Sequence, residues 1–145
     1  QCEALVSRTV SAFGGLHVAF NNAGIPGSMT KAVHEYELDE WNRMIAINLT
    51  GVFHSIKAEV PALLASGGGA IINTASVAGL VSAPHMASYA TAKHGVVGLT
   101  KVATASNTPQ SSHRCQSLSF SLTPAWIKAN RNSAVEKAAA DSERI

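Results

Sequence analysis

The sequence has few charges and almost no cysteine. Only 14% of its 145 residues are charged, and 11 Lys and Arg against 9 Asp and Glu give a net charge of +2 without a cluster of one sign. A basic surface for nucleic acid or for an anionic membrane is therefore not expected. Cys2 and Cys115 lie far apart, and this spacing indicates neither a disulfide framework nor a zinc site.

Long apolar runs and metal-binding spacings are missing as well. No basic region precedes an apolar stretch at the start, and no apolar run reaches the ~18 residues of a membrane span. We therefore expect no signal peptide, no membrane segment and a cytoplasmic location. The six histidines never stand at the His-Glu-x-x-His spacing, so no metal site is predicted. The 46% of apolar residues are typical of one packed globular unit.

Apolar periodicity predicts that helices and strands alternate over residues 1–104. In chain order we expect a helix around 6–13, a strand at 16–20, a helix at about 39–65 that Pro61 kinks or ends, a strand at 70–74 and a helix at about 88–104. Both strands are continuously apolar, which is typical of a parallel sheet with helices on both faces. The predicted fold class is therefore α/β.

Polar residues interrupt this pattern where a parallel sheet would bind a ligand. The stretch Asn21-Asn22-Ala23-Gly24 follows the first strand, and Ser76 follows the second. These positions belong to the carboxyl ends of the strands, where open α/β sheets bind their ligands. Asn48 occupies a position in the apolar stripe of the long helix, where an amide requires a hydrogen-bond partner. It either fixes a neighbouring strand end or takes part in the chemistry.

Tyr89 and Lys93 stand four residues apart on the last predicted helix. Positions i and i+4 lie on the same helix face, so the phenol and the ammonium can share one small volume. A free tyrosine ionises only near pH ~10. An ammonium about 4 Å away favours the phenolate by roughly 4 kcal/mol at an effective dielectric constant of about 20. Alone, such a pair also fits an exposed helix surface, so its meaning depends on the other motifs.

Four motifs occur in a fixed order: NNAG at 21–24, LTGVF directly after Asn48, IINTAS at 71–76 and YATAK at 89–93. In their order and spacing they resemble the short-chain dehydrogenase/reductase family over residues 6–101. The resemblance implies a Rossmann-like, doubly wound parallel sheet. It also implies an oxidoreductase that acts on a small-molecule alcohol or ketone with NAD or NADP as cofactor.

The resemblance implies a catalytic role for four residues. Tyr89 would be the general acid or base that exchanges a proton with the substrate oxygen. Lys93 would favour the Tyr89 phenolate and hold the nicotinamide ribose. Ser76 would donate a hydrogen bond to the substrate oxygen, although a serine after a strand can also be only a turn residue. Asn48 would connect Lys93 to solvent through water.

Cofactor binding is implied for the turn after the first strand. Asn22, Ala23 and Gly24 would line the adenine and ribose side of the dinucleotide, and Tyr89 and Lys93 would contact its other end. Members of the family typically assemble through their long helices. A homo-oligomer, dimer or tetramer, is therefore expected for the complete protein.

Two parts of the family pattern do not occur in these 145 residues. One is the glycine-rich turn from a strand to a helix, which would receive the pyrophosphate. The other is the continuation after Lys101, where periodicity ends. Residues 105–145 are predicted to be an atypical tail with a possible strand at 119–122 and a possible helix at 133–144. Two functions thus stay open: the oxidoreductase, or a truncated, catalytically incompetent fragment that acts at most in oligomerisation.

Overall fold

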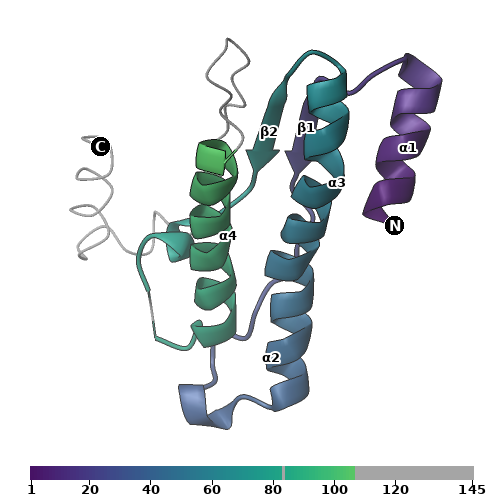
Figure 1. Ribbon diagram of the computed structural model, residues 1–145. Coiled ribbons are helices and arrows are strands. Elements are labelled where there is room, and N and C mark those ends of the chain that lie inside the picture. The colour runs from purple at the N-terminus through teal and green to yellow at the C-terminus, as the bar shows by residue number, and fades with distance from the viewer. Residues whose placement is uncertain (83, 107–145) are drawn as a thin grey trace.

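The computed structural model describes residues 1–82 and 84–106 (Figure 1). Its elements are α1 (Cys2–Phe13), β1 (Val18–Asn21), the 3-10 turn η1 (Val33–Glu35), α2 (Leu38–Ile45), the π-helix η2 (Ala46–Thr50), α3 (Gly51–Ala65), β2 (Ala70–Asn73), the 3-10 turn η3 (Val77–Gly79) and α4 (Ala87–Ser106). The helices and strands predicted within these residues are all present. The strand at 119–122 and the helix at 133–144 lie outside the described residues.

The two strands pair in parallel. Val18 of β1 stands opposite Ala70 of β2, and Asn21 stands opposite Asn73. Since paired parallel strands end at the same edge of a sheet, the polar segments after Asn21 and Asn73 begin side by side. This pairing confirms the predicted α/β class and places the polar motifs at one location.

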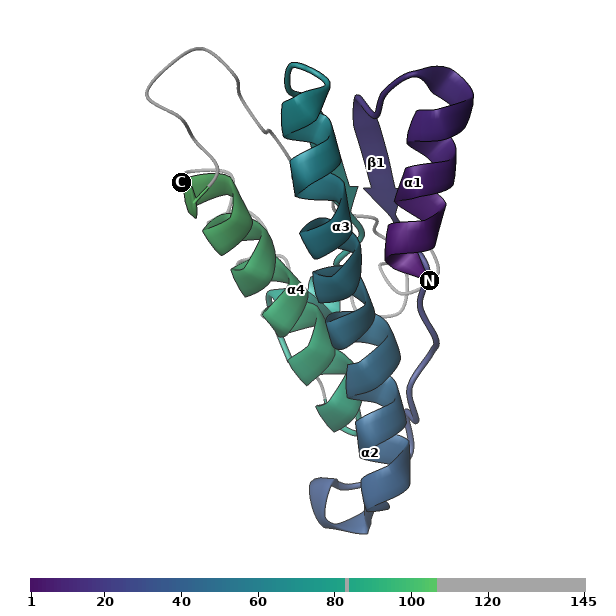
Figure 2. The same cartoon turned by 45° about the vertical axis from the view of Figure 1, so that its right-hand side comes forward.

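The described helices lie on one face of the two-stranded sheet. Figure 2 shows α3 between α4 and α1, with β1 behind them. The opposite face carries Val18 and Phe20, each 61% exposed. The connectivity explains this arrangement, because right-handed crossovers keep their helices on the same side while a parallel sheet grows in one direction.

The apolar core lies between the sheet and the inner faces of α3 and α4. Its buried members are Ala19, Val52, Ile56, Leu63, Ile71, Ala75, Val96 and Val97. Gly95 of α4 permits close packing against η2, because a Cβ there would lie 2.7 Å from the Leu49 side chain. The glycine that follows the YATAK motif so closely is therefore required where α4 approaches the long helix.

The long helix runs without interruption from α2 through η2 into α3. Pro61 was expected to kink or end it; α3 continues past Pro61 to Ala65, so the proline does not end the helix, and the kink stays a prediction. Both Pro61 and Lys57, the residue whose carbonyl loses its helical donor, are exposed, so water can satisfy that carbonyl. The helix ends instead at Ser66, and Gly67 follows with a φ of +89°.

A chain of side-chain hydrogen bonds ties the strand ends to the helices. Asn21 Nδ2 donates to Glu59 Oε2 and to Asn73 Oδ1, each at 3.0 Å. Asn73 Nδ2 in turn donates to Thr100 Oγ1 at 3.0 Å. Asn21 therefore connects β1 with β2 and α3, and Asn73 extends the connection to α4.

Glu59 makes stability depend on pH. Burial raises the pKa of its carboxyl, and the bond from Asn21 lowers it by less. The folded pKa thus exceeds the unfolded value of about 4.3, so the contribution of Glu59 to stability is fully present below that value and is lost as pH rises through the folded pKa. Glu59→Gln keeps an acceptor for Asn21 without the charge. We expect the variant to be more stable than wild type at pH 7 by up to about 1 kcal/mol, after allowance for solvent screening.

Urea unfolding followed by circular dichroism at neutral pH and near pH 4 measures this difference. The advantage of Glu59→Gln should shrink at the lower pH, where the wild-type carboxyl is mostly protonated in both states. An equal or lower stability of the variant at pH 7 would contradict the assignment.

Candidate active site

A cavity of about 350 Å³ opens at the carboxyl ends of β1 and β2. The loop after β1, the segment after β2 and the first turns of α4 enclose it together with η2. Six of the predicted site residues line it: Asn22, Gly24, Asn48, Ser76, Tyr89 and Lys93. Ala23 is exposed and does not line the cavity.

Tyr89 and Lys93 reach this cavity from one face of α4. Lys93 Nζ lies 5.7 Å from the centroid of the Tyr89 ring and donates to the carbonyl oxygen of Thr74 at 2.7 Å. Lys93 is only 6% exposed, and burial lowers the pKa of its ammonium. Within the described residues the Tyr89 hydroxyl has no hydrogen-bond partner, so it is available to a bound molecule. The i, i+4 spacing thus places the phenol and the cation in one compartment.

Ser76 is positioned by the turn that it caps. Its Oγ accepts a hydrogen bond from Ala78 N at 3.2 Å at the start of η3. Gly79 lets this turn pack directly on α4, because a Cβ there would lie 2.7 Å from the backbone oxygen of Lys93. Ser76 is therefore a turn residue, and its hydroxyl proton still remains for a substrate oxygen.

Asn48 is 1% exposed, and both polar atoms of its side-chain amide are hydrogen-bonded. Its Oδ1 accepts from Ile25 N at 2.8 Å, and its Nδ2 donates to Ile25 O at 2.9 Å and to Met44 Sδ at 3.0 Å. These contacts match the structural alternative, in which the amide fixes the segment after a strand. The connection from Lys93 through Asn48 to solvent stays a prediction.

Several contributors to the site were missed in the sequence. Thr74 supplies the acceptor for Lys93, and its hydroxyl donates to Asn22 Oδ1 at 2.9 Å. Met29 forms an apolar wall of the cavity. A backbone carbonyl or a lone methionine has no chemical signature in a sequence. The position of Thr74 directly before the Ala75-Ser76 pair was the one available signal.

The described residues were also searched for features of other functional classes. Within residues 1–82 and 84–106, no three His, Cys, Asp or Glu side chains are grouped as metal ligands. No helix in that same part of the chain has the length and apolar character needed to cross a membrane.

A family model described as short chain dehydrogenase matches residues 1–117. The chain belongs to this family. The resemblance inferred from the four motifs is thereby confirmed. The match continues past residue 104, where the sequence suggested the start of an atypical tail, and that boundary stays a prediction.

Similar proteins agree with the family assignment. Cyclohexanol dehydrogenase of Acinetobacter sp. (strain SE19) is 54% identical over 101 residues, or 70% of this chain and 40% of the relative. Trans-4-hydroxycyclohexanecarboxylate dehydrogenase of Sinomonas cyclohexanicum is 52% identical over 99 residues, or 68% and 37%.

A solved structure agrees with the fold. Carveol dehydrogenase from Mycobacterium avium in complex with NAD superposes with a TM-score of 0.68 at 38% identity, over 72% of this chain and 38% of that one. The likeness confirms the Rossmann-like α/β fold, and the chain spans about 40% of the length of the curated relatives that it matches.

Lys93 should lower the stability of the fold at neutral pH. Because its folded pKa is lowered, the unfolded chain binds the proton more tightly, and stability rises with pH toward the unfolded pKa of about 10.4. Lys93→Met removes the charge at similar side-chain length, and the Thr74 carbonyl is left to the water of the cavity. We expect Lys93→Met to be more stable at pH 7 by up to about 1 kcal/mol, discounted for solvent screening, with a smaller gain near pH ~10.

Urea unfolding at both pH values checks the expectation. Lys101→Met serves as the control, because Lys101 is exposed on the same helix and its replacement should change stability by no more than about 0.5 kcal/mol. A Lys93→Met variant that unfolds more readily than wild type at neutral pH would show that the buried ammonium stabilises the fold.

Proposed function

We propose that this short chain dehydrogenase interconverts a cyclic secondary alcohol and its ketone with NAD or NADP, and that Tyr89 is the general acid or base. The observation that carries the proposal is the grouping of Tyr89, Lys93 and Ser76 around one cavity at the strand ends. Each of these side chains has a free hydrogen-bonding capacity in that cavity.

Tyr89 would move the proton of the substrate oxygen. During alcohol oxidation its phenolate accepts the hydroxyl proton, and during ketone reduction its hydroxyl donates a proton to the carbonyl oxygen. Lys93 favours the phenolate through its positive charge on the same side of the cavity. The absence of a protein partner for the Tyr89 hydroxyl within the described residues supports this role, since the substrate oxygen can take that place.

Ser76 would hold the substrate oxygen during this transfer. Its Oγ accepts a hydrogen bond from Ala78 N, which fixes the position of the oxygen. The O–H of Ser76 is then left to donate to another acceptor. A hydroxyl held in this way is preorganised to stabilise the charge that develops on a substrate oxygen. Ser76 and Tyr89 would thus both contact the same atom of the substrate.

The residues at this edge fit the nicotinamide end of NAD or NADP. An ammonium has three donors, and Lys93 uses one of them on Thr74, so two remain for the hydroxyls of a ribose. Asn22, Ala23 and Gly24 would support the adenine and ribose side. When bound, the cofactor accepts or supplies the hydride. The relative that was solved with NAD supports the same cofactor class here.

The substrate class follows from the cavity walls and from the relatives. Ile25, Met29, Val81 and Met86 give the cavity apolar surfaces beside the polar group of Ser76 and Tyr89. A cavity of this kind suits a compact apolar body with one oxygen. Two relatives above 50% identity are named for the oxidation of six-membered ring alcohols. A six-membered alicyclic alcohol or ketone is therefore the proposed substrate.

We further propose that the complete protein is a homo-oligomer that assembles through the long helix. The segment from α2 to α3 exposes four large apolar side chains: Leu38, Ile47, Phe53 and Leu64. Apolar side chains of this size on one helix are typical of surfaces that pack against another chain.

A chimera tests the proposed activity. In cyclohexanol dehydrogenase of Acinetobacter, the segment that matches this chain over 101 residues is replaced with the corresponding residues of this chain. Oxidation of cyclohexanol is then followed by the absorbance of the reduced cofactor, once with NAD and once with NADP. We expect turnover, and Tyr89→Phe in the chimera should lower kcat by at least about 100-fold while leaving cofactor binding unchanged. Thr91→Val, on the exposed side of the same helix, is the matched control.

Retained turnover in the Tyr89→Phe chimera would exclude the proton-transfer role. A folded chimera that binds cofactor without any turnover would contradict the proposed activity. Fluorescence of the bound reduced cofactor reports binding in both cases.

A further inference from the structure

Two segments far apart in the sequence form opposite walls of the active-site cavity. Residues 24–29 contribute Met29, and residues 81–86 contribute Val81 and Met86. Among the described residues, which exclude residue 83, only one donor makes a hydrogen bond between segment 24–37 and segment 80–87. That donor is the hydroxyl of Tyr36.

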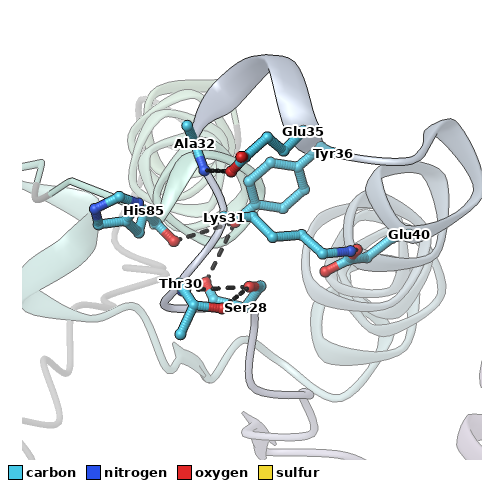
Figure 3. A network of polar contacts seen from close by, with 8 residues as sticks. All are labelled: Ser28, Thr30, Lys31, Ala32, Glu35, Tyr36, Glu40 and His85. Carbon is cyan, nitrogen blue, oxygen red and sulfur yellow. Dashed lines mark hydrogen bonds and ion pairs between the residues drawn. The ribbon is translucent and has the colours of Figure 1, made fainter.

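Tyr36 lies directly after η1, and its hydroxyl reaches both walls (Figure 3). The Oη is 3.2 Å from the carbonyl oxygen of Ser28 and 3.2 Å from the carbonyl oxygen of His85. A phenol has only one proton, so this donor is shared between the two carbonyls. Ser28 belongs to one wall, and His85 directly precedes Met86 in the other.

The turn that carries Tyr36 is held by contacts of its own. Glu35 Oε2 accepts from Ala32 N at 2.6 Å, and Lys31 forms an ion pair with Glu40 of α2 (Figure 3). These contacts are independent of both walls. The phenol therefore extends from a braced turn toward two segments that it can hold in place.

Met86 stands between two cavities. It is 8% exposed and lines the active-site cavity as well as a neighbouring cavity of about 480 Å³, which Val33 and His94 also border. His85 has a φ of +65°, in the left-handed region that residues other than glycine rarely adopt. The bond from Tyr36 stabilises this unfavourable backbone directly before Met86.

We propose that Tyr36 is a positioning residue that holds Met86 as the partition between the two cavities and so restricts the active site to compact ring ketones and alcohols. The identity of the substrate rests on the proposed function, but the restraint on Met86 does not. Without the hydroxyl, Met86 is free to shift toward the second cavity, and a ring with a bulky apolar substituent then fits.

Hydrogen exchange in the 145-residue chain tests the restraint without a ligand. Tyr36→Phe removes only the shared donor, so amides within residues 84–89 should exchange about fivefold faster, the effect of losing one neutral hydrogen bond. Thr30→Val is the matched control, because the Thr30 hydroxyl contacts Ser28 within its own segment. Each rate is divided by that of α3, so general destabilisation cancels. An unchanged ratio in Tyr36→Phe overturns the proposal.

Titration with two ketones tests the consequence for substrate size. Cyclohexanone and tert-butylcyclohexanone are titrated into the same chains by ligand-observed NMR. Wild type and Thr30→Val should prefer the smaller ketone, and Tyr36→Phe should narrow the affinity ratio by about fivefold. A lower affinity for both ketones at an unchanged ratio overturns the proposal. If neither ketone binds wild type, the proposed substrate class fails, and the exchange experiment alone decides the role of Tyr36.

Discussion

The amide of Asn48 fixes the loop from which one side of the cavity is built. It pairs with both the N–H and the carbonyl of Ile25, so a residue in the interior of a long helix satisfies the backbone of a loop that has left its strand. The π-helix around Asn48 belongs to the same arrangement, since such widened turns often occur at functional sites. Gly27 then comes so close to α4 that a Cβ there would lie 3.0 Å from Tyr89 Cβ. The loop, the long helix and the phenol are thus positioned by one buried contact.

The elements of the fold could be predicted because local periodicity reports them directly. Apolar strands next to helices with an i, i+3, i+4 pattern were sufficient for the α/β class. Two features of the fold depend on non-local information. Pro61 is tolerated because it faces solvent, and the face on which the helices lie depends on strand order, which periodicity does not encode.

The candidate site shows the same division between local and distant information. Tyr89, Lys93 and Ser76 could be proposed because they stand in motifs whose order and spacing resemble a known family. Thr74 and Tyr36 could not, because the first acts through its carbonyl and the second donates to the backbone carbonyls of Ser28 and His85. Backbone acceptors are identical in every residue, so only the folded chain shows which of them are used.

The two buried ionisable groups near the strand ends change the stability of the fold with pH in opposite directions. Burial lowers the pKa of Lys93 and raises the pKa of Glu59, so desolvation disfavours the charged form of each. Lys93 lines the cavity, where its charge serves the proposed proton transfer, whereas Glu59 accepts a bond from Asn21 and does not line it. The destabilisation by Lys93 thus accompanies a proposed function, as is common in active sites. Glu59 instead contributes an acceptor that an uncharged amide could replace, so the fold does not require its charge.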